Sequence, residues 1–233
     1  MKRISDHYTE QLREIRGLIL RMGGMVETMT RRVILALIQR DSSLLTEVRS
    51  MEAQVNQLHI EIDEACIEII ALRQPAGYDL RFVTAAIKIN TDLERIGDQA
   101  TNILGETESL LAVPLLKPLI DIPKMAEIAQ DMLKDALDAF VNGDVDLAQR
   151  TIKRDDIVDK LKDSVFIELI GYMTNDPSTI PRAMDLILVS RNLERIADHA
   201  TNICEHVIFM VQGKDVRHQG YGLLPEPETE NKP

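Results

Sequence analysis

Residues 93–103 read LERIGDQATNI, and residues 193–203 read LERIADHATNI, so nine of the eleven positions are identical. Two helices that merely share an amphipathic pattern do not match so closely by chance. An internal repeat of this length fixes the architecture before any single motif is interpreted. Each copy contains Glu-x-x-x-Asp-x-x-x-Asn, and we therefore search for functional residues along these two segments.

The rest of the chain is predicted to be helical almost throughout. Apolar residues recur at three- and four-residue spacing. Asp41 and Asp144 are predicted to cap the helices that follow them, and Asp176 to mark a helix end before Pro177. Breaks rich in Gly, Pro, Asn and Ser separate the apolar segments. Six helices are expected, at 7–40, 43–73, 78–111, 119–142, 144–174 and 179–212.

The repeat extends beyond the signature segment. Leu58 aligns with Leu161 at an offset of 103, and the offset falls to 100 before the last helix of the second copy. Each half therefore consists of three helices joined by short turns, which favours antiparallel neighbours. The predicted fold is all-α, with two tandem pseudo-symmetric three-helix bundles at 1–113 and 114–213. Residues 112–123 are expected to act as a hinge, and 214–233 as a flexible tail.

Composition excludes several classes of protein. The net charge of −11, the absence of Trp and an aromatic content of 3% argue against nucleic-acid binding. No membrane-spanning segment is expected, because the most apolar stretch, 110–120, is interrupted by Pro114, Lys117 and Pro118. No apolar run follows the first basic residues, so no signal peptide is expected. Cys66 and Cys204 are then expected to be reduced core thiols in a cytoplasmic protein.

An acidic stripe accompanies the repeat. On a helical wheel, Glu94, Asp98 and Asn102 lie nearly opposite the apolar arc, four residues apart. The stripe continues to Glu106 in the first copy and to His206 in the second. The preceding helices repeat the arrangement with Glu52, Asn56, His59 and Asp63 in the first half, and Asp155 and Asp159 in the second. Two adjacent helices of each half are expected to present oxygen atoms on the same outward side.

Such a stripe has two readings from spacing alone. Carboxylates with an amide suit Mg²⁺, Mn²⁺, Fe or Zn²⁺, and a bound cation would relieve the repulsion between them. Alternatively the stripe is an ordinary charged face, neutralised by Arg95 and Arg195. Catalysis is not expected, because no Glu is followed by His three residues later and residues 22–25 lack the Lys of a phosphate loop. That Gly pair is instead expected to kink a long helix.

The chain resembles the PhoU family, the phosphate-specific transport system accessory proteins of bacteria. The resemblance rests on the doubled signature together with 62–66 (IDEAC), 73–75 (RQP), 79–81 (DLR) and Arg217-His218, and it covers about residues 5–220. It implies a cytoplasmic homodimer that is not an enzyme and that negatively regulates the phosphate-starvation (Pho) regulon and phosphate uptake. The partners implied are the ATPase subunit of the phosphate ABC importer and the phosphate sensor histidine kinase, which would recruit the protein to the inner face of the membrane.

The resemblance also implies metal ligands, because some members carry multinuclear clusters on Glu/Asp-x-x-x-Asp motifs. The matching pairs are Glu94 with Asp98, Glu194 with Asp198, and Asp155 with Asp159, whereas Glu52 is followed by Asn56 and departs from the pattern. The second half is therefore the better candidate. A metal-binding or storage protein, or a metal-dependent enzyme, is the alternative function. The full set of candidate ligands is Glu52, Glu94, Asp98, Asn102, Asp155, Asp159, Glu194, Asp198 and Asn202.

Overall fold

The computed structural model describes the backbone of residues 2–216 and the side chains of 7–216, and every regular element in that range is helical. The all-helical prediction is thus confirmed, and most helix bounds differ from those expected by only a few residues. The elements are α1 (Lys2–Gln39), α2 (Ser43–Arg73), α3 (Tyr78–Leu111), α4 (Asp121–Asn142), α5 (Val145–Ile152), α6 (Asp155–Asn175), the 3₁₀ turn η1 (Pro177–Thr179) and α7 (Ile180–Gln212).

The fifth expected helix, 144–174, was wrong as a single element. A turn at Lys153 and Arg154 divides it into α5 and α6. The guanidinium of Arg154 contacts the carboxylates of Asp135 at 2.8 Å and Asp131 at 3.4 Å, both on α4. No Gly or Pro marks this break, and the contacts made by Arg154 are with residues of another helix. As a consequence Asp155 is in the first turn of a helix, where the helix dipole favours a negative charge.

The predicted cap at Asp144 and the predicted helix end at Asp176 are confirmed, because α5 begins at Val145 and α6 ends at Asn175, whereas the N-cap residue of α2 is Ser42. The Asp144 carboxylate accepts a hydrogen bond from the Leu147 amide at 2.9 Å, and Asp176 accepts one from the Ser178 amide at 2.9 Å. Asp41 accepts from the Ser43 amide at the same distance. Short polar side chains at these positions satisfy amides that have no partner within the helix.

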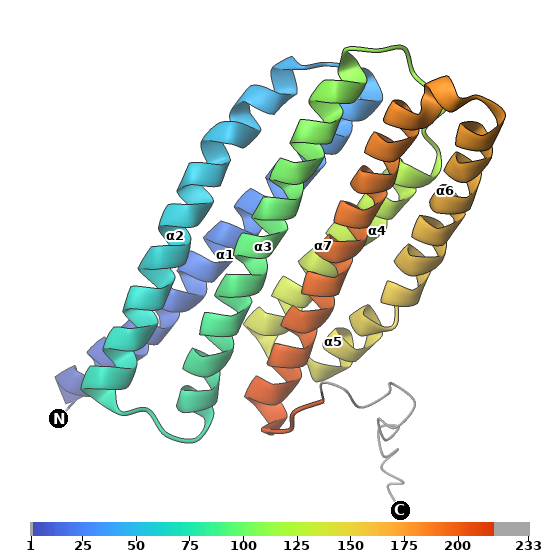
Figure 1. Ribbon diagram of the computed structural model, residues 1–233. Helices are drawn as coiled ribbons and strands as arrows, with labels where there is room; N and C mark the ends of the chain where they lie inside the picture. Colours follow the sequence, from blue (N-terminus) through green and yellow to red (C-terminus); the bar gives the residue numbers. More distant parts are fainter. Residues whose placement is uncertain (1, 217–233) are drawn as a thin grey trace, which may run out of the picture.

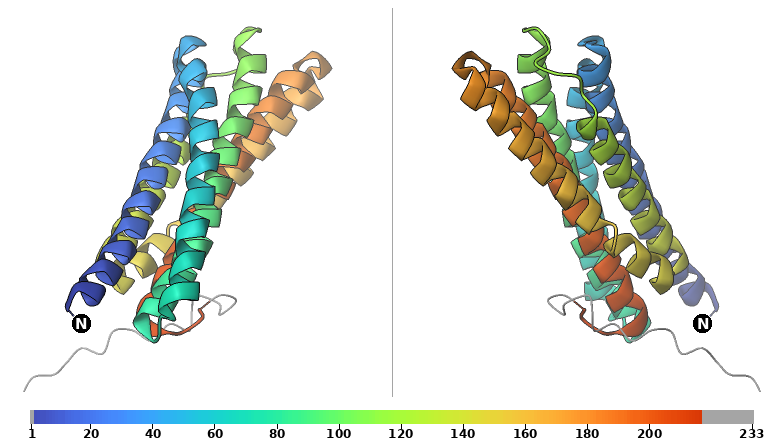
Figure 2. Two further views of the ribbon diagram at one scale, coloured as in Figure 1. Left: turned by 90° about the vertical axis from the view of Figure 1, so that its left-hand side faces the viewer. Right: turned by 90° about the vertical axis from the view of Figure 1, so that its right-hand side faces the viewer.

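The two halves pack against each other along their length. Helices α1, α2 and α3 form one antiparallel group and α4 to α7 the other, with α3 against α7 and α1 against α4 (Figure 1). Phe82 of α3 and Phe140 of α4 stack with ring centroids 5.8 Å apart, and buried side chains from both halves form one continuous hydrophobic cluster. Figure 2 shows that α6 and the adjoining part of α7 lean away from the first half at one end. The domain boundary at residue 113 stays a prediction.

The segment between α3 and α4, residues 112–120, makes polar contacts with residues of three helices. Arg40, at the end of α1, donates hydrogen bonds to the carbonyls of Leu111 at 2.9 Å and Val113 at 2.7 Å. The buried ammonium group of Lys117 pairs with Glu168 of α6, and Arg182 of α7 donates to the Pro114 carbonyl at 3.3 Å. The segment expected to be a hinge thus connects the halves through specific polar contacts. The expected tail lies outside the described residues, apart from 214–216.

A kink was expected at the glycine pair of α1, but close packing against α4 accounts for Gly23. Helix α1 continues through it, and a Cβ atom at Gly23 would lie 2.5 Å from Leu137 of α4. The missing side chain therefore lets α1 and α4 approach closely.

Cys66 and Cys204 are buried free thiols, as predicted, and burial raises the pKa of each to about 12. Thiols with so high a pKa stay protonated at neutral pH and are poor nucleophiles. No helix within residues 2–216 combines the length and the apolar character needed to cross a bilayer.

Candidate functional site

The acidic stripes lie at the edge of the core. The Glu94 and Asp98 side chains are 24% and 37% exposed, whereas Leu93 and Ile96, one and two residues away, are fully buried. The stripes turn away from the core only in part, because Asn102 and Asp198 are exposed whereas Glu94 and Glu194 are about one quarter exposed. They run along the side where α3 meets α2 and where α7 meets α6, because each of these helices contacts neighbours on more than one side.

In the second half, carboxylates of two helices meet as predicted. The Lys162 ammonium group of α6 lies 3.2 Å from the Glu194 carboxylate of α7 and 3.3 Å from that of Asp159. Burial, followed by the charges of Asp198, Asp159 and Glu194, raises the pKa of Asp155 to about 7. We call Asp155, Asp159, Glu194 and Asp198 the carboxylate cluster.

The Asp198 carboxyl belongs to the same electrostatic group. Burial is the largest cause that raises its pKa, and the negative charges of Glu194 and Asp159 add to it. The positive charges of His199 and Lys162 oppose this shift without cancelling it. Burial is thus the main cause of both raised pKa values, and the like charges within the carboxylate cluster add to it because they disfavour the ionised form.

The corresponding carboxylates of the first half are better neutralised. The Arg95 guanidinium lies 3.5 Å from Glu94 and 3.3 Å from Asp98. Within residues 7–216, its counterpart Arg195 forms no such ion pair with Glu194 or Asp198. On the facing helix, Glu52 is half-buried and Asn56 is exposed, so α2 brings fewer charges to this surface than α6 does.

The donor types of the carboxylate cluster suit a divalent cation, and its raised pKa values mean that added positive charge would be favourable. Among the side chains of residues 7–216, however, no three His, Cys, Asp or Glu groups are arranged to hold a metal ion. A cation would require these carboxylates to turn toward a common point and displace Lys162. Metal binding by the predicted ligands thus remains a proposal, and Asn102 is exposed on α3 apart from these contacts.

The structure places the side chains of Asn202 and His206 at Asp92, away from the predicted acidic stripe. The Asn202 amide donates a hydrogen bond to the Asp92 carboxylate of α3 at 3.2 Å. The rings of His199 and His206 approach the same carboxylate at 2.9 and 3.3 Å. These side chains point from α7 toward Asp92 of α3. They therefore connect the two halves and do not extend the acidic surface.

Sequence reasoning missed Asp92, although a signal was present. Asp92 is three residues after Ile89 and four before Ile96, which places it within the apolar arc of α3. Burial raises the pKa of this carboxyl, but hydrogen bonds with His199 and His206 outweigh burial, and the net pKa is lowered. A buried acid with such partners is ionised at neutral pH and stabilises the contact between the halves.

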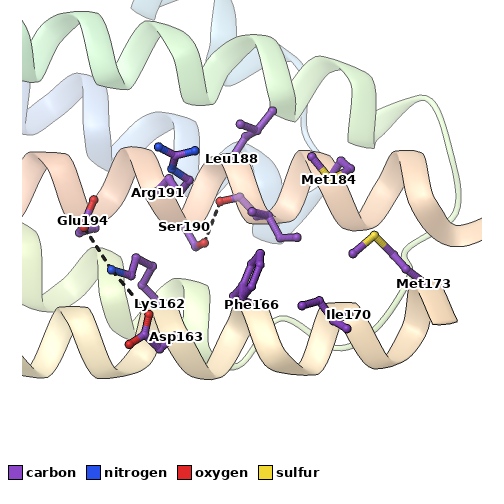
Figure 3. A pocket seen from close by; sticks show the side chains of 11 residues that line it. Lys162, Asp163, Phe166, Ile170, Met173, Met184, Leu188, Ser190, Arg191 and Glu194 are labelled. Atoms are coloured by element: carbon purple, nitrogen blue, oxygen red, sulfur yellow. Dashed lines mark hydrogen bonds and ion pairs between the residues drawn. The ribbon is translucent and has the colours of Figure 1, made fainter.

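A groove between α6 and α7 was also missed. It has a volume of about 610 Å³ and begins at Lys162 and Glu194, where the carboxylate cluster lies. Figure 3 shows Phe166 between the two helices, with Met173 and Met184 toward the far end. The available signal was the apolar pair Phe166 and Ile170, four residues apart, because Phe166 replaces the Asp63 of the first copy.

The fold and the carboxylate cluster define a class of protein. It is an all-helical tandem repeat that carries carboxylates on the outward sides of its helices. Comparison with known families identifies the repeat. The PhoU domain matches residues 19–107 and again 122–207, and the chain therefore belongs to the PhoU domain family. The family resemblance stated from the sequence is confirmed.

Relatives match over almost the whole chain. The phosphate-specific transport system accessory protein PhoU homolog of Pseudomonas putida is 41% identical over 93% of this chain and 85% of its own length. The protein of that name from Escherichia coli K12, PhoU, is 37% identical over 94% of this chain and 91% of its own. The crystal structure of PhoU from Pseudomonas aeruginosa matches with a TM-score of 0.86 and 38% identity, covering 89% of this chain and 100% of that one.

A more distant relative has the same fold. The phosphate transport system regulatory protein PhoU from Streptococcus pneumoniae matches with a TM-score of 0.83 at 27% identity, over 90% of this chain and 99% of its own. The arrangement of helices is therefore retained at low sequence identity.

Proposed function

We propose that this protein is an accessory protein of a phosphate-specific transport system, acting as a negative regulator of the phosphate-starvation regulon and of phosphate uptake. The support is membership of the PhoU domain family, together with relatives of matching length whose names state this transport role. The protein is not an enzyme in this proposal. It works by binding other proteins.

In this proposal the protein is a cytoplasmic homodimeric adaptor. It links the ATPase subunit of the phosphate importer to the phosphate sensor histidine kinase, and these partners bring it to the inner face of the membrane. The observation that supports an adaptor best is the carboxylate cluster, which brings four acidic side chains of α6 and α7 together at the surface. A basic patch on a partner would supply the opposite charge, which speeds encounter and fixes orientation.

The test replaces Glu194 and Asp198 by Ala. Both side chains lie at the edge of the core, so helicity measured by circular dichroism should change little. We expect a reporter of the phosphate-starvation regulon to lose repression in phosphate-rich medium, and affinity for the purified ATPase or kinase to fall about tenfold at low salt. The matched control is the double substitution of Glu94 and Asp98 by Ala, which should have a smaller effect because Arg95 already neutralises that pair. Normal repression and normal binding of both partners by the E194A/D198A variant would refute the role of this surface.

Divalent-metal binding at the carboxylate cluster is the second candidate, favoured by the raised pKa of Asp155. The ions considered are Fe, Zn²⁺, Mn²⁺ and Mg²⁺. Elemental analysis after purification without a metal-affinity tag separates the alternatives. Exchangeable metal without turnover agrees with an adaptor, whereas stoichiometric redox-active iron with turnover would support a storage protein or an enzyme.

A further inference from the structure

The groove between α6 and α7 exposes large apolar side chains. Phe166 is 47% exposed and Met184 is 43% exposed, and Ile170 and Met173 continue the same face of α6. Figure 3 shows Phe166, Ile170 and Met173 on α6 and Met184 on α7, with the ion pair of Lys162 and Glu194 at the opposite end. An apolar patch of this kind on a soluble protein indicates an interaction site.

The first half provides an internal comparison, because the repeat offsets place Asp63 and Asn90 at the positions of Phe166 and Ser190. The Asn90 amide donates hydrogen bonds to the Asp63 carboxylate and to the His59 carbonyl, both at 2.9 Å, and so joins α3 to α2. The Ser190 hydroxyl instead donates to the Ile187 carbonyl of its own helix at 2.8 Å. The polar link between the two helices is therefore replaced by an open apolar groove in the second half.

A third position agrees with this difference. Lys88 of α3 corresponds to Leu188, which lines the groove. The Lys88 ammonium group lies 5.6 Å from the centre of the Phe209 ring of α7, and is thus used in the contact between the halves. The same fold carries a polar residue at each of these positions in one copy, so helix packing does not by itself require the apolar groove.

The length and charge of the groove indicate what binds there. From Lys162 to Met173 an α-helix rises about 16 Å, or three turns, which suits a partner helix with anchors at i, i+3 or i+4, and i+7. Two methionines at the far end adapt readily to different side chains. The charges of Lys162 and Arg191 within the groove are balanced by Asp163 and Glu194, and the other members of the carboxylate cluster make the near end negative.

We propose that this groove binds an amphipathic helix of a partner protein, with its apolar face against Phe166, Ile170 and Met184 and with Lys or Arg residues at the end that meets the carboxylate cluster. The inference rests on the proposed adaptor function and names the chemistry of the segment that the adaptor binds. Charge complementarity at one end sets the orientation of that helix, and the apolar contacts supply affinity.

The experiment uses a fluorescein-labelled helical peptide of about 18 residues, with Leu at i, i+3, i+7 and i+10 followed by four Lys residues. Its binding to the full chain is measured by fluorescence anisotropy. The test variant is F166D/S190N, which introduces into the second half the pair that links α2 and α3 in the first. We expect this variant to bind the peptide at least about tenfold more weakly. Met184→Gln on α7 is a second variant, with the same expected direction.

Two controls make the result specific. Ile167→Asp changes a residue that is 71% exposed beside Phe166 but does not line the groove, and it should bind the peptide as the wild type does. The same peptide with Glu in place of Lys should bind the wild type at least about tenfold more weakly, since the carboxylate cluster repels it. Unchanged binding by F166D/S190N and Met184→Gln, or an equal loss in Ile167→Asp, would overturn the proposal.

The alternative occupant of the groove is a second copy of this chain, and sedimentation velocity tests it. If F166D/S190N abolishes self-association and the wild type does not bind the peptide, the groove is an interface between two copies of this chain and the proposal is overturned. These measurements contain no phosphate and no transport partner. If the peptide does not bind, the proposed role in phosphate regulation is still tested separately by the reporter in cells. If that role is refuted, the peptide-binding result still stands.

Discussion

The α2–α3 surface of the first half and the α6–α7 surface of the second half come from the same repeat and differ in chemistry. In the first, Asp63 and Asn90 join the two helices, and Arg95 neutralises Glu94 and Asp98. In the second, an apolar groove ends at Lys162 and Glu194, next to Asp155 and Asp198, whose pKa values are raised. The two copies thus share a packing scheme, while the apolar groove described above lies between α6 and α7 of the second copy.

Identical residues of the two copies have different charged neighbours. Glu94 and Glu194 occupy the same position of the repeat, and each is about one quarter exposed. Glu194 faces Lys162 and the aspartates of α6, whereas Glu94 pairs with Arg95 of its own helix. The facing helix, and not the shared motif, therefore decides how charge is distributed on each surface.

The largest expected effect tests whether the halves unfold as one unit. Phe140→Ala removes a fully buried ring that stacks on Phe82 across the two halves, and should lower the free energy of unfolding by about 3–5 kcal/mol. Calorimetry should show a single transition at lower temperature. Two separate transitions would mean that each half is stable alone and must be compared with the other as an independent domain.

The contact between the halves at Asp92 should have the next largest effect. Asp92→Asn weakens charge-assisted hydrogen bonds with His199 and His206 and should lower the free energy of unfolding by about 2–3 kcal/mol at pH 7. The lowered pKa of Asp92 means that this stabilisation is present above its unfolded value of 3.8 and is lost as pH falls through the folded value. Denaturation in urea at pH 7 and pH 3 measures both predictions. An equal loss at the two pH values would contradict them.

Matched substitutions at one repeat position compare the polar links directly. Asn90→Ala leaves the partly buried His59 carbonyl and the Asp63 carboxylate without this donor, and should lower the free energy of unfolding by about 2 kcal/mol. Ser190→Ala removes a bond within its own helix and should lower it by about 0.5 kcal/mol. Equal effects in urea denaturation would mean that the difference between the two surfaces has no energetic basis.

Replacing Asp155 should stabilise the protein. Asp155 has a folded pKa of about 7 against 3.8, so its contribution is most favourable below pH 3.8 and is lost as pH rises to 7. Because the side chain is partly exposed, Asp155→Asn should raise the free energy of unfolding by only about 1–2 kcal/mol at pH 8, and by almost nothing near pH 4.

The first half supplies the control for this effect. Asp98→Asn removes a carboxylate that Arg95 already pairs with, and should change stability by about 0.5 kcal/mol or less. If Asp98→Asn stabilises the protein at pH 8 as much as Asp155→Asn does, the difference in charge between the two surfaces is not real.

Local signals accounted for most of what the sequence predicted correctly. Leu93, Ile96 and Ile103 are fully buried as the helical period requires, Asp144 accepts the expected capping bond, and α6 ends before Asp176 as expected. The break at Arg154 was invisible in the sequence because the carboxylates that hold it belong to α4. Likewise Asn202 was placed with the stripe because its spacing matches, although its partner Asp92 is on another helix.

The sequence alone determined that this is a duplicated all-helical protein of the PhoU domain family with carboxylates in register on both copies, because helical periodicity and repetition are properties of spacing along one chain. Only the tertiary structure decided that the second copy carries an open apolar groove beside a carboxylate cluster, whereas the first is closed by Asp63 and Asn90. The physical reason is that solvation, pKa and groove shape depend on which side chains a neighbouring helix places within a few ångströms.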